Sequence, residues 1–142
     1  LEGGHVDRAE FERWMESAKR TLTSARHDLT AGSYNWACFK AHQAAEKAVK
    51  AVLWGLGYPR IGHSLNMLLR HAEALGIDVP RGVSGAALRL DKYYTITRCP
   101  DAWADGIPED YFDRHEAEDA IRYAEAIMRW AGEIWQGLSR SA

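Results

Sequence analysis

The residues best suited to binding chemistry gather where a predicted helix gives way to a polar loop. Arg98 follows Lys92 and the neighbouring rings of Tyr93 and Tyr94. An arginine presents a planar set of donors that fits a phosphate, and an aromatic ring beside it can stack on a base. This grouping predicts a nucleotide or phosphate contact at Arg98, assisted by Lys92 and Tyr93. The structural alternative is that Arg98 and Tyr94 hold the loop in place, with Tyr94 in the core.

A second group of cations follows one face of another predicted helix. Lys40, Gln43, Lys47 and Lys50 recur at i, i+3, i+7 and i+10, a spacing that places side chains on one side of a helix. Lys47 and Lys50 are therefore candidates for phosphate contacts. The same spacing also describes an ordinary solvated face, on which Glu46 and Lys50 would form an i, i+4 ion pair.

Other kinds of chemistry have less support. His42 and Glu46 share a helix face, but no second helix supplies the further ligands that a metal site needs. We therefore expect no metal and no cofactor. His63 precedes a predicted helix start, where a structural hydrogen bond is expected. Cys38 and Cys99 form neither a zinc nor a disulfide pattern, and the chain has no G-x-S-x-G motif.

Size and charge limit the classes of protein that fit. The chain has 142 residues, with 18 Lys and Arg against 20 Asp and Glu, and this length suits a single domain. A net charge of -2 argues against broad, sequence-independent nucleic-acid binding, although a local basic pocket remains compatible with it. No apolar stretch reaches the ~20 residues of a membrane span. We expect a soluble, cytoplasmic protein with no membrane partner.

Apolar residues recur at helical spacing through most of the chain, which predicts an all-α fold. Short connections favour an antiparallel up-down helical bundle of four long helices plus one short helix. The central helix is apolar on most sides and should be the least exposed. We expect residues 6–138 to form one domain, preceded by a cloning or processing remnant at residues 1–5. The predicted helices cover residues 8–31, 34–56, 64–75, 84–97 and 114–138.

Two predicted helix starts carry the pattern of a capping box. Asp7 is followed three positions later by Glu10, and Asp113 by Glu116. In such a box the first side chain accepts a hydrogen bond from a free backbone N–H, and the glutamate reaches back to the first residue.

The run YNWACFKAHQAAEKAVKAVL at residues 34–53 is similar to the central helix of the HEPN (higher eukaryotes and prokaryotes nucleotide-binding) family. Three later pieces agree in order: GHSL from Gly62, YYTITRCPD from Tyr93, and an element at residues 108–111. The resemblance implies an antiparallel helical bundle, usually a homodimer. Such proteins are often paired with a minimal nucleotidyltransferase as toxin and antitoxin. Some members cut RNA, and others are nucleotide-binding modules.

The chain departs from the ribonuclease pattern of that family. Those members carry Arg, four to six residues and then His, so that Arg stabilises charge on the phosphate and His moves the 2′-hydroxyl proton. After Arg98 the positions for His hold Trp103, Ala104 and Asp105. His115, near the start of the last predicted helix, could replace the missing residue if the loop folds back.

Three functions follow from the resemblance. The leading interpretation is a non-catalytic or weakly active homodimeric module that binds a nucleotide or an RNA end. The alternatives are a metal-independent endoribonuclease toxin using Arg98 and His115, and a ligand-free protein-interaction bundle.

Trp36, Phe39 and Trp54 leave the central helix away from its Ala/Val seam, so we expect one or more of them at a twofold interface.

Overall fold

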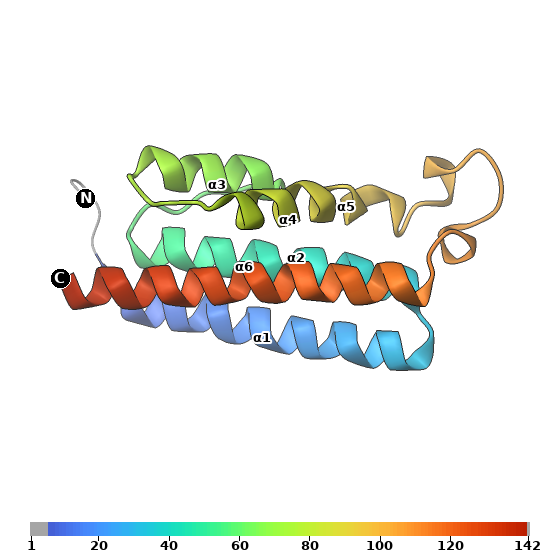
Figure 1. Cartoon of the computed structure of the whole chain (residues 1–142), viewed down its shortest axis with the longest axis horizontal. Helices are drawn as coiled ribbons and strands as arrows, with labels where there is room; N and C mark the ends of the chain where they lie inside the picture. Colours follow the sequence, from blue (N-terminus) through green and yellow to red (C-terminus); the bar gives the residue numbers. More distant parts are fainter. Residues whose placement is uncertain (1–5, 142) are drawn as a thin grey trace.

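A computed structural model describes residues 6–141 of the chain, with side chains through residue 138; the remnant expected at residues 1–5 lies outside the described residues. Within this range the chain forms helices and no β-strand, which confirms the predicted all-α antiparallel bundle (Figure 1). The elements are α1 (Arg8–Ala31), α2 (Tyr34–Gly55), α3 (Leu65–Ala74), α4 (Arg81–Asp91), α5 (Tyr93–Ile96), the 3-10 turns η1 (Pro100–Ala102) and η2 (Pro108–Asp110), and α6 (Arg114–Ser141).

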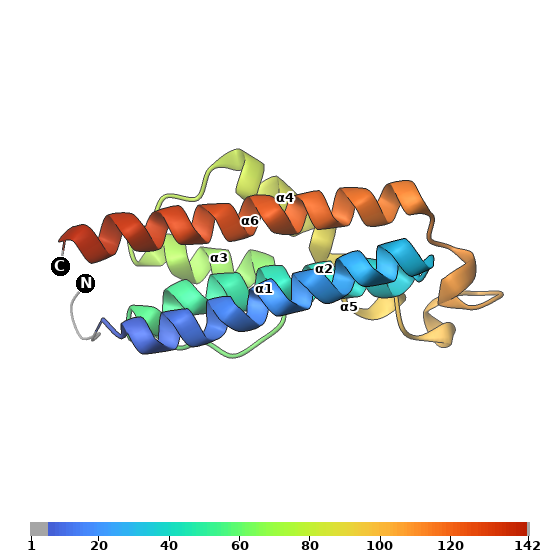
Figure 2. The same ribbon diagram turned by 90° about the horizontal axis from the view of Figure 1, so that it is seen from below.

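The three long helices α1, α2 and α6 lie side by side, and α3, α4 and α5 cover a second side of the bundle (Figure 1). The start of α1 meets the end of α2, where the N–H of Asp7 donates to the carbonyl of Gly55 at 2.6 Å. It also meets the end of α6, where Phe11 stacks on Trp135 with ring centroids 4.4 Å apart. Helix α1 is therefore antiparallel to both. Figure 2 shows the loop with η1 and η2 beyond the opposite end of the bundle.

Helix α2 is the centre of the fold, as the sequence predicts. Of its 22 residues, 15 are buried, and many of these are alanines that let the neighbouring helices approach closely. Three ionisable residues, His42, Glu46 and Lys50, are buried with them at 0%, 5% and 7% exposure. Ionisable groups in a core need partners, so their contacts should determine how other elements sit on α2.

The two predicted capping boxes are only half formed. Asp7 Oδ1 accepts from the Glu10 N–H at 3.1 Å, and Asp113 Oδ1 accepts from the Glu116 N–H at 2.8 Å, which confirms both aspartates as N-caps. The prediction that the Glu10 carboxylate accepts a hydrogen bond from the Asp7 N–H is wrong. The Asp7 N–H donates to the carbonyl of Gly55, and the Glu10 carboxylate accepts from Arg13 one turn later. Tertiary contact at the start of α1 has replaced the local bond.

The fourth predicted helix starts earlier and is interrupted. Helix α4 begins at Arg81, after Pro80, whose φ of -62° suits a helix start. The helix stops at Asp91, and the short α5 follows from Tyr93. Because of this break, Tyr93, Tyr94 and Arg98 lie in the connection between α4 and α6.

Gly55 makes the closest approach of α2 to its neighbours. A Cβ at this position would lie 2.7 Å from Trp135 Cζ3 and 2.9 Å from Phe11 Cβ. We expect Gly55→Ala to lower the free energy of unfolding by ~1–3 kcal/mol through overpacking. The control is Gly132→Ala in α6, where a Cβ meets nothing within 4 Å and should raise stability by ~0.5–1 kcal/mol. Urea denaturation measures both, and equal stabilities for the two variants would contradict this packing.

Candidate functional site

Arg98 lies just after α5 and packs on two aromatic rings. Its guanidinium carbon is 4.3 Å from the ring centroid of Phe39 on α2 and 4.8 Å from that of Tyr94. Arg98 Nε donates to the Tyr94 carbonyl at 2.9 Å, and Nη2 donates to the same oxygen. The side chain thus anchors the end of α5, as the structural alternative supposes. A guanidinium has further N–H groups that can bind an anion.

A chain of contacts leads from Tyr94 into the core. The Tyr94 ring stacks on His63 at 4.7 Å between centroids, with 17° between the planes. His63 Nδ1 lies 3.1 Å from Glu46 Oε1, and Glu46 Oε2 accepts from Lys50 Nζ at 2.9 Å. The side chains of Glu46 and Lys50 are only 6% and 9% exposed. Lys50, a predicted phosphate contact, is thus a partner in a buried ion pair and does not lie on a solvated face.

Asp91 is a central residue of the site that sequence reasoning missed. Its carboxylate accepts from the backbone N–H of Leu65 at 2.8 Å and of Asn66 at 3.0 Å, at the start of α3. Oδ1 also lies 3.1 Å from His42 Nε2. Burial raises the pKa of Asp91, but the hydrogen bonds from His42, Asn66 and Leu65 outweigh it, so the pKa lies below its usual value. These partners are distant in the sequence, so no local pattern reveals them.

Tyr93 faces away from Tyr94 and toward α6. The ring is buried, and its hydroxyl donates to Glu116 Oε2 at 2.9 Å. Burial raises the pKa of Tyr93, and the hydrogen bond with the Glu116 carboxylate raises it further. Burial and the same carboxylate also raise the pKa of the Cys38 thiol, which makes Cys38 a poor nucleophile.

Lys92, Tyr93 and His115 line a pocket of about 430 Å³ between the α4–α5 segment and α6. His115 is exposed, and its Nε2 lies 3.5 Å from Asp119 Oδ2. Arg98 does not line this pocket and packs on Phe39 and Tyr94. The structure therefore groups His115 with Lys92 and Tyr93 in a pocket whose lining does not include Arg98.

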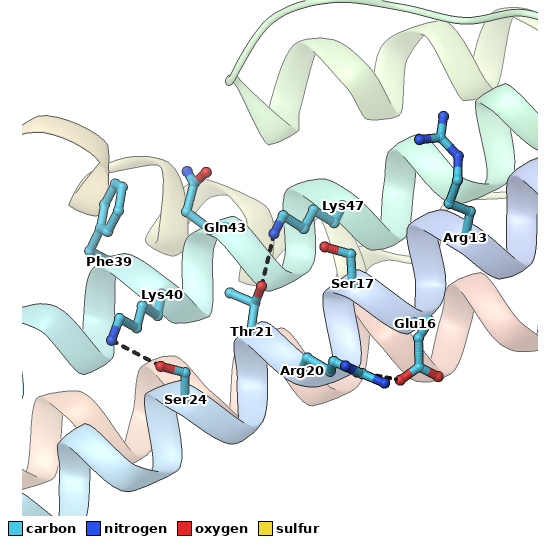
Figure 3. Close-up of a pocket in the computed structure, with 10 residues that line it drawn as sticks. All are labelled: Arg13, Glu16, Ser17, Arg20, Thr21, Ser24, Phe39, Lys40, Gln43 and Lys47. Atoms are coloured by element: carbon cyan, nitrogen blue, oxygen red, sulfur yellow. Dashed lines mark hydrogen bonds and ion pairs between the residues drawn. The ribbon is translucent and has the colours of Figure 1, made fainter.

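Lys47 lines a larger groove of about 580 Å³ between α1 and α2 (Figure 3). Lys47 Nζ donates to Thr21 Oγ1 at 2.9 Å, and Lys40 Nζ donates to Ser24 Oγ at 2.9 Å. Phe39 lines the same groove and is also the ring beneath Arg98. The groove and the Arg98 site therefore share the Phe39 ring.

The predicted interface tryptophans have different surroundings. Trp36 is 39% exposed and meets the edge of Phe39 at 6.0 Å between centroids. Trp54 packs at 5.4 Å on Trp14 of α1 and is partly buried. Trp36 is thus the member of this set that is most available to a second chain.

Among the described residues, no group of three or more His, Cys, Asp or Glu side chains could hold a metal ion. None of the helices in the described part is long and apolar enough to cross a bilayer.

The bundle has a buried helix at its centre that carries three ionisable side chains, and an arginine packed on aromatic rings beside it. These features define a class of small helical domains. The model of the HEPN domain family matches residues 11–135. The chain therefore belongs to the HEPN domain family.

Solved structures of other proteins are similar to this chain, three of which illustrate the likeness. A protein from Thermus thermophilus is 40% identical, with a TM-score of 0.84, and the match covers 87% of this chain and 97% of that one. An archaeal HEPN homologue is 37% identical, with a TM-score of 0.74 and the same coverage. An HEPN domain protein of Thermotoga maritima is 38% identical, with a TM-score of 0.71, over 87% of this chain and 98% of that one. The comparison with curated proteins gave no match.

The lowered pKa of Asp91 has a consequence for stability. An ionised Asp91 stabilises the fold above about pH 4, the range of an unfolded aspartate, and this contribution is lost as pH falls through the lower folded-state pKa. We expect Asp91→Asn to cost roughly 1.5–3 kcal/mol near neutral pH, the range for hydrogen bonds to a charged group. The difference from the unmodified chain should shrink below about pH 4.

The control for this experiment is Asp78→Asn, because Asp78 is exposed. Urea denaturation at several pH values measures both variants. A loss in Asp91→Asn that is the same at acidic and neutral pH would show that the charge of Asp91 is not what stabilises the fold.

Proposed function

We propose that this HEPN domain protein is a homodimeric module that binds a nucleotide or an RNA end and does not cleave RNA. The observation that carries the proposal is the Arg98 guanidinium, held on the rings of Phe39 and Tyr94. Its hydrogen bonds to the Tyr94 carbonyl fix its orientation before any ligand arrives. A preorganised group loses less conformational freedom on binding, so this arginine is well suited to a phosphate.

A pocket on Tyr94, the tyrosine that orients Arg98, favours a nucleotide over a bare phosphate. A pocket of about 300 Å³ beside the Tyr94 ring is lined by His63, Ser64, Asp91 and Thr95. These side chains supply both donors and acceptors, which suit the polar edge of a base or a ribose hydroxyl. The phosphate of the same ligand would then reach Arg98.

A ribonuclease would need Arg98 and His115 to act on one phosphate. Within one chain Arg98 does not line the pocket that holds His115, and His115 lies near an aspartate of its own helix. The binding module is therefore the better supported function. A partnership with a minimal nucleotidyltransferase, as toxin and antitoxin, is proposed only because members of the family are often paired with such an enzyme.

The binding site is tested by Arg98→Ala, with AMP and a short RNA as probes. We expect a loss of about 1.5–3 kcal/mol, or roughly tenfold to a hundredfold in affinity, because a charge-assisted hydrogen bond is removed. Isothermal titration calorimetry measures the change. The matched control is Arg89→Ala, because Arg89 also packs over a tyrosine but lines the pocket on the α6 side.

The outcomes of this test separate the functions. Equal affinities for the Arg98 and Arg89 variants would reject the site. His115→Ala should leave binding unchanged, and RNA cleavage that both Arg98→Ala and His115→Ala abolish would replace the module with the ribonuclease. A melting temperature that collapses in Arg98→Ala, with unchanged binding per folded molecule, would make Arg98 only a loop anchor.

The proposed dimer is tested by Trp36→Ala. A tryptophan at the centre of an interface is often worth 2 kcal/mol or more, so the dimer should weaken by roughly thirtyfold or more. Light scattering across a concentration series measures this change. Leu88→Ala removes an exposed apolar side chain from α4 and is the control. A monomeric unmodified chain at micromolar concentration would contradict the dimer.

A further inference from the structure

His63 lines the proposed nucleotide pocket, and its two ring nitrogens have different surroundings. Nδ1 lies 3.1 Å from Glu46 Oε1 and 3.3 Å from Glu46 Oε2, whereas Nε2 has no hydrogen bond with any described residue. We propose that His63 Nε2 selects nucleotides whose base carries an exocyclic amino group, and that protonation of His63 removes this preference. The inference rests on the proposed function and adds to it the part of the base that is recognised and the dependence of recognition on pH.

The partners of Glu46 decide which nitrogen of His63 carries the proton. The Glu46 carboxylate accepts from Lys50 Nζ at 2.9 Å and from Gln43 Nε2 at 3.4 Å. A carboxylate in an ion pair is an acceptor only, so the histidine nitrogen that faces it must be the N–H. Neutral His63 therefore has its proton on Nδ1 and a lone pair on Nε2. When the ring takes a second proton, Nε2 changes from an acceptor to a donor.

The other polar groups of the pocket do not distinguish an amino group from a hydrogen-bond acceptor. The Asp91 carboxylate accepts from two backbone N–H groups at the start of α3 and from the Ser64 hydroxyl, which itself accepts from another backbone N–H. Tyr94 and Thr95 carry hydroxyl groups, which donate or accept as a ligand requires. Neutral His63 offers an acceptor alone. It is therefore the lining side chain that can select a donor on the base.

The ring of His63 is held in place before a ligand arrives. Glu46 binds it at one edge, and Tyr94 stacks on its face with 4.7 Å between the ring centroids. These two contacts fix the direction of Nε2, and a preorganised group loses less freedom on binding. The His63 side chain is 54% exposed, so a ligand and protons from solvent both have access to the ring.

The charged and titratable groups around His63 come from three helices, as Glu46 and Lys50 of α2, Asp91 of α4 and Tyr94 of α5. Among side chains, histidine is the one that ordinarily changes charge between about pH 5 and pH 8. A second histidine, His42, packs 5.4 Å from the Tyr94 ring but is fully buried. Both of its nitrogens already have partners, in Asp91 and Gln43, so it has no free atom for a ligand.

The test compares AMP with purine riboside 5′-monophosphate, which is AMP without its amino group. Isothermal titration calorimetry on the full chain gives the ratio of the two affinities. We expect AMP to bind roughly threefold to tenfold more tightly at about pH 8, the effect of one hydrogen bond, and no more tightly at about pH 5.5. Because both ligands carry the same phosphate, its titration and any change at Arg98 cancel from the ratio.

Two variants and a control assign the effect to His63. His63→Phe keeps a ring for Tyr94 and removes both nitrogens, so the two ligands should bind it equally at both pH values. The control is His27→Phe, which changes an exposed histidine of α1 outside the pocket and should keep the ratio and its pH dependence.

Glu46→Gln tests the position of the proton directly. Because Lys50 would keep the amide oxygen, the amide nitrogen faces His63 Nδ1 and donates to it, which moves the histidine proton to Nε2. This variant should therefore lose the preference for AMP even at the higher pH. Should it fold poorly by circular dichroism, because Glu46 and Lys50 form a buried pair, the comparison of His63→Phe with its control decides the result.

The outcomes separate the role of His63 from the Arg98 site. Equal affinities of the unmodified chain for the two ligands at the higher pH, both weakened by Arg98→Ala, overturn the role of His63 and leave the Arg98 site standing. A preference for AMP that persists in His63→Phe, or in a folded Glu46→Gln, also overturns it. Failure of both ligands to bind the unmodified chain overturns the proposed function and this inference with it.

Discussion

The fold depends on the burial of three ionisable residues in its central helix. His42, Glu46 and Lys50 of α2 are almost without exposure, and a core cannot hold such groups unless each has a partner. Glu46 and Lys50 are partners of each other on α2, but His42 finds its partner at the end of α4, and Glu46 finds a second partner in the segment before α3. The requirement to pair these groups fixes the second layer of helices on the first.

The candidate site is built on this network. The Asp91 carboxylate is hydrogen-bonded to His42 on one side and accepts hydrogen bonds from free N–H groups at the start of α3 on the other. A single carboxylate therefore joins α2, α3 and α4. His63, hydrogen-bonded to Glu46, supports the Tyr94 ring, and the Tyr94 carbonyl in turn orients Arg98. The surface that we propose for ligand binding is thus an extension of the core. A change at Glu46 should therefore move Arg98, although Glu46 does not line the proposed nucleotide pocket.

Helical periodicity was sufficient to predict α1, α2, α3 and α6, because a helix places its apolar residues by local rules, but it did not reveal the break between α4 and α5. The left-handed Gly32, at φ 81° after α1, and the Asp113 N-cap follow from the same local rules. The site is different because its contacts join distant residues. The stripe of lysines gave no sign that Lys50 is buried and Lys47 is not, since that depends on which helix packs beside each turn. Nor could adjacent tyrosines in the sequence show which one faces α6.

The central claim is that Arg98, oriented by Tyr94 and Phe39, receives the phosphate of a nucleotide. The most direct measurement is a titration of the isotope-labelled chain with AMP, followed by the ¹H–¹⁵N NMR signals of the Arg98 side chain and the backbone. The account predicts that the Arg98 Nε–H signal shifts, together with the amides of Thr95 and Cys99 beside it. Shifts confined to the surroundings of His115, with the Arg98 signal unchanged, would contradict it.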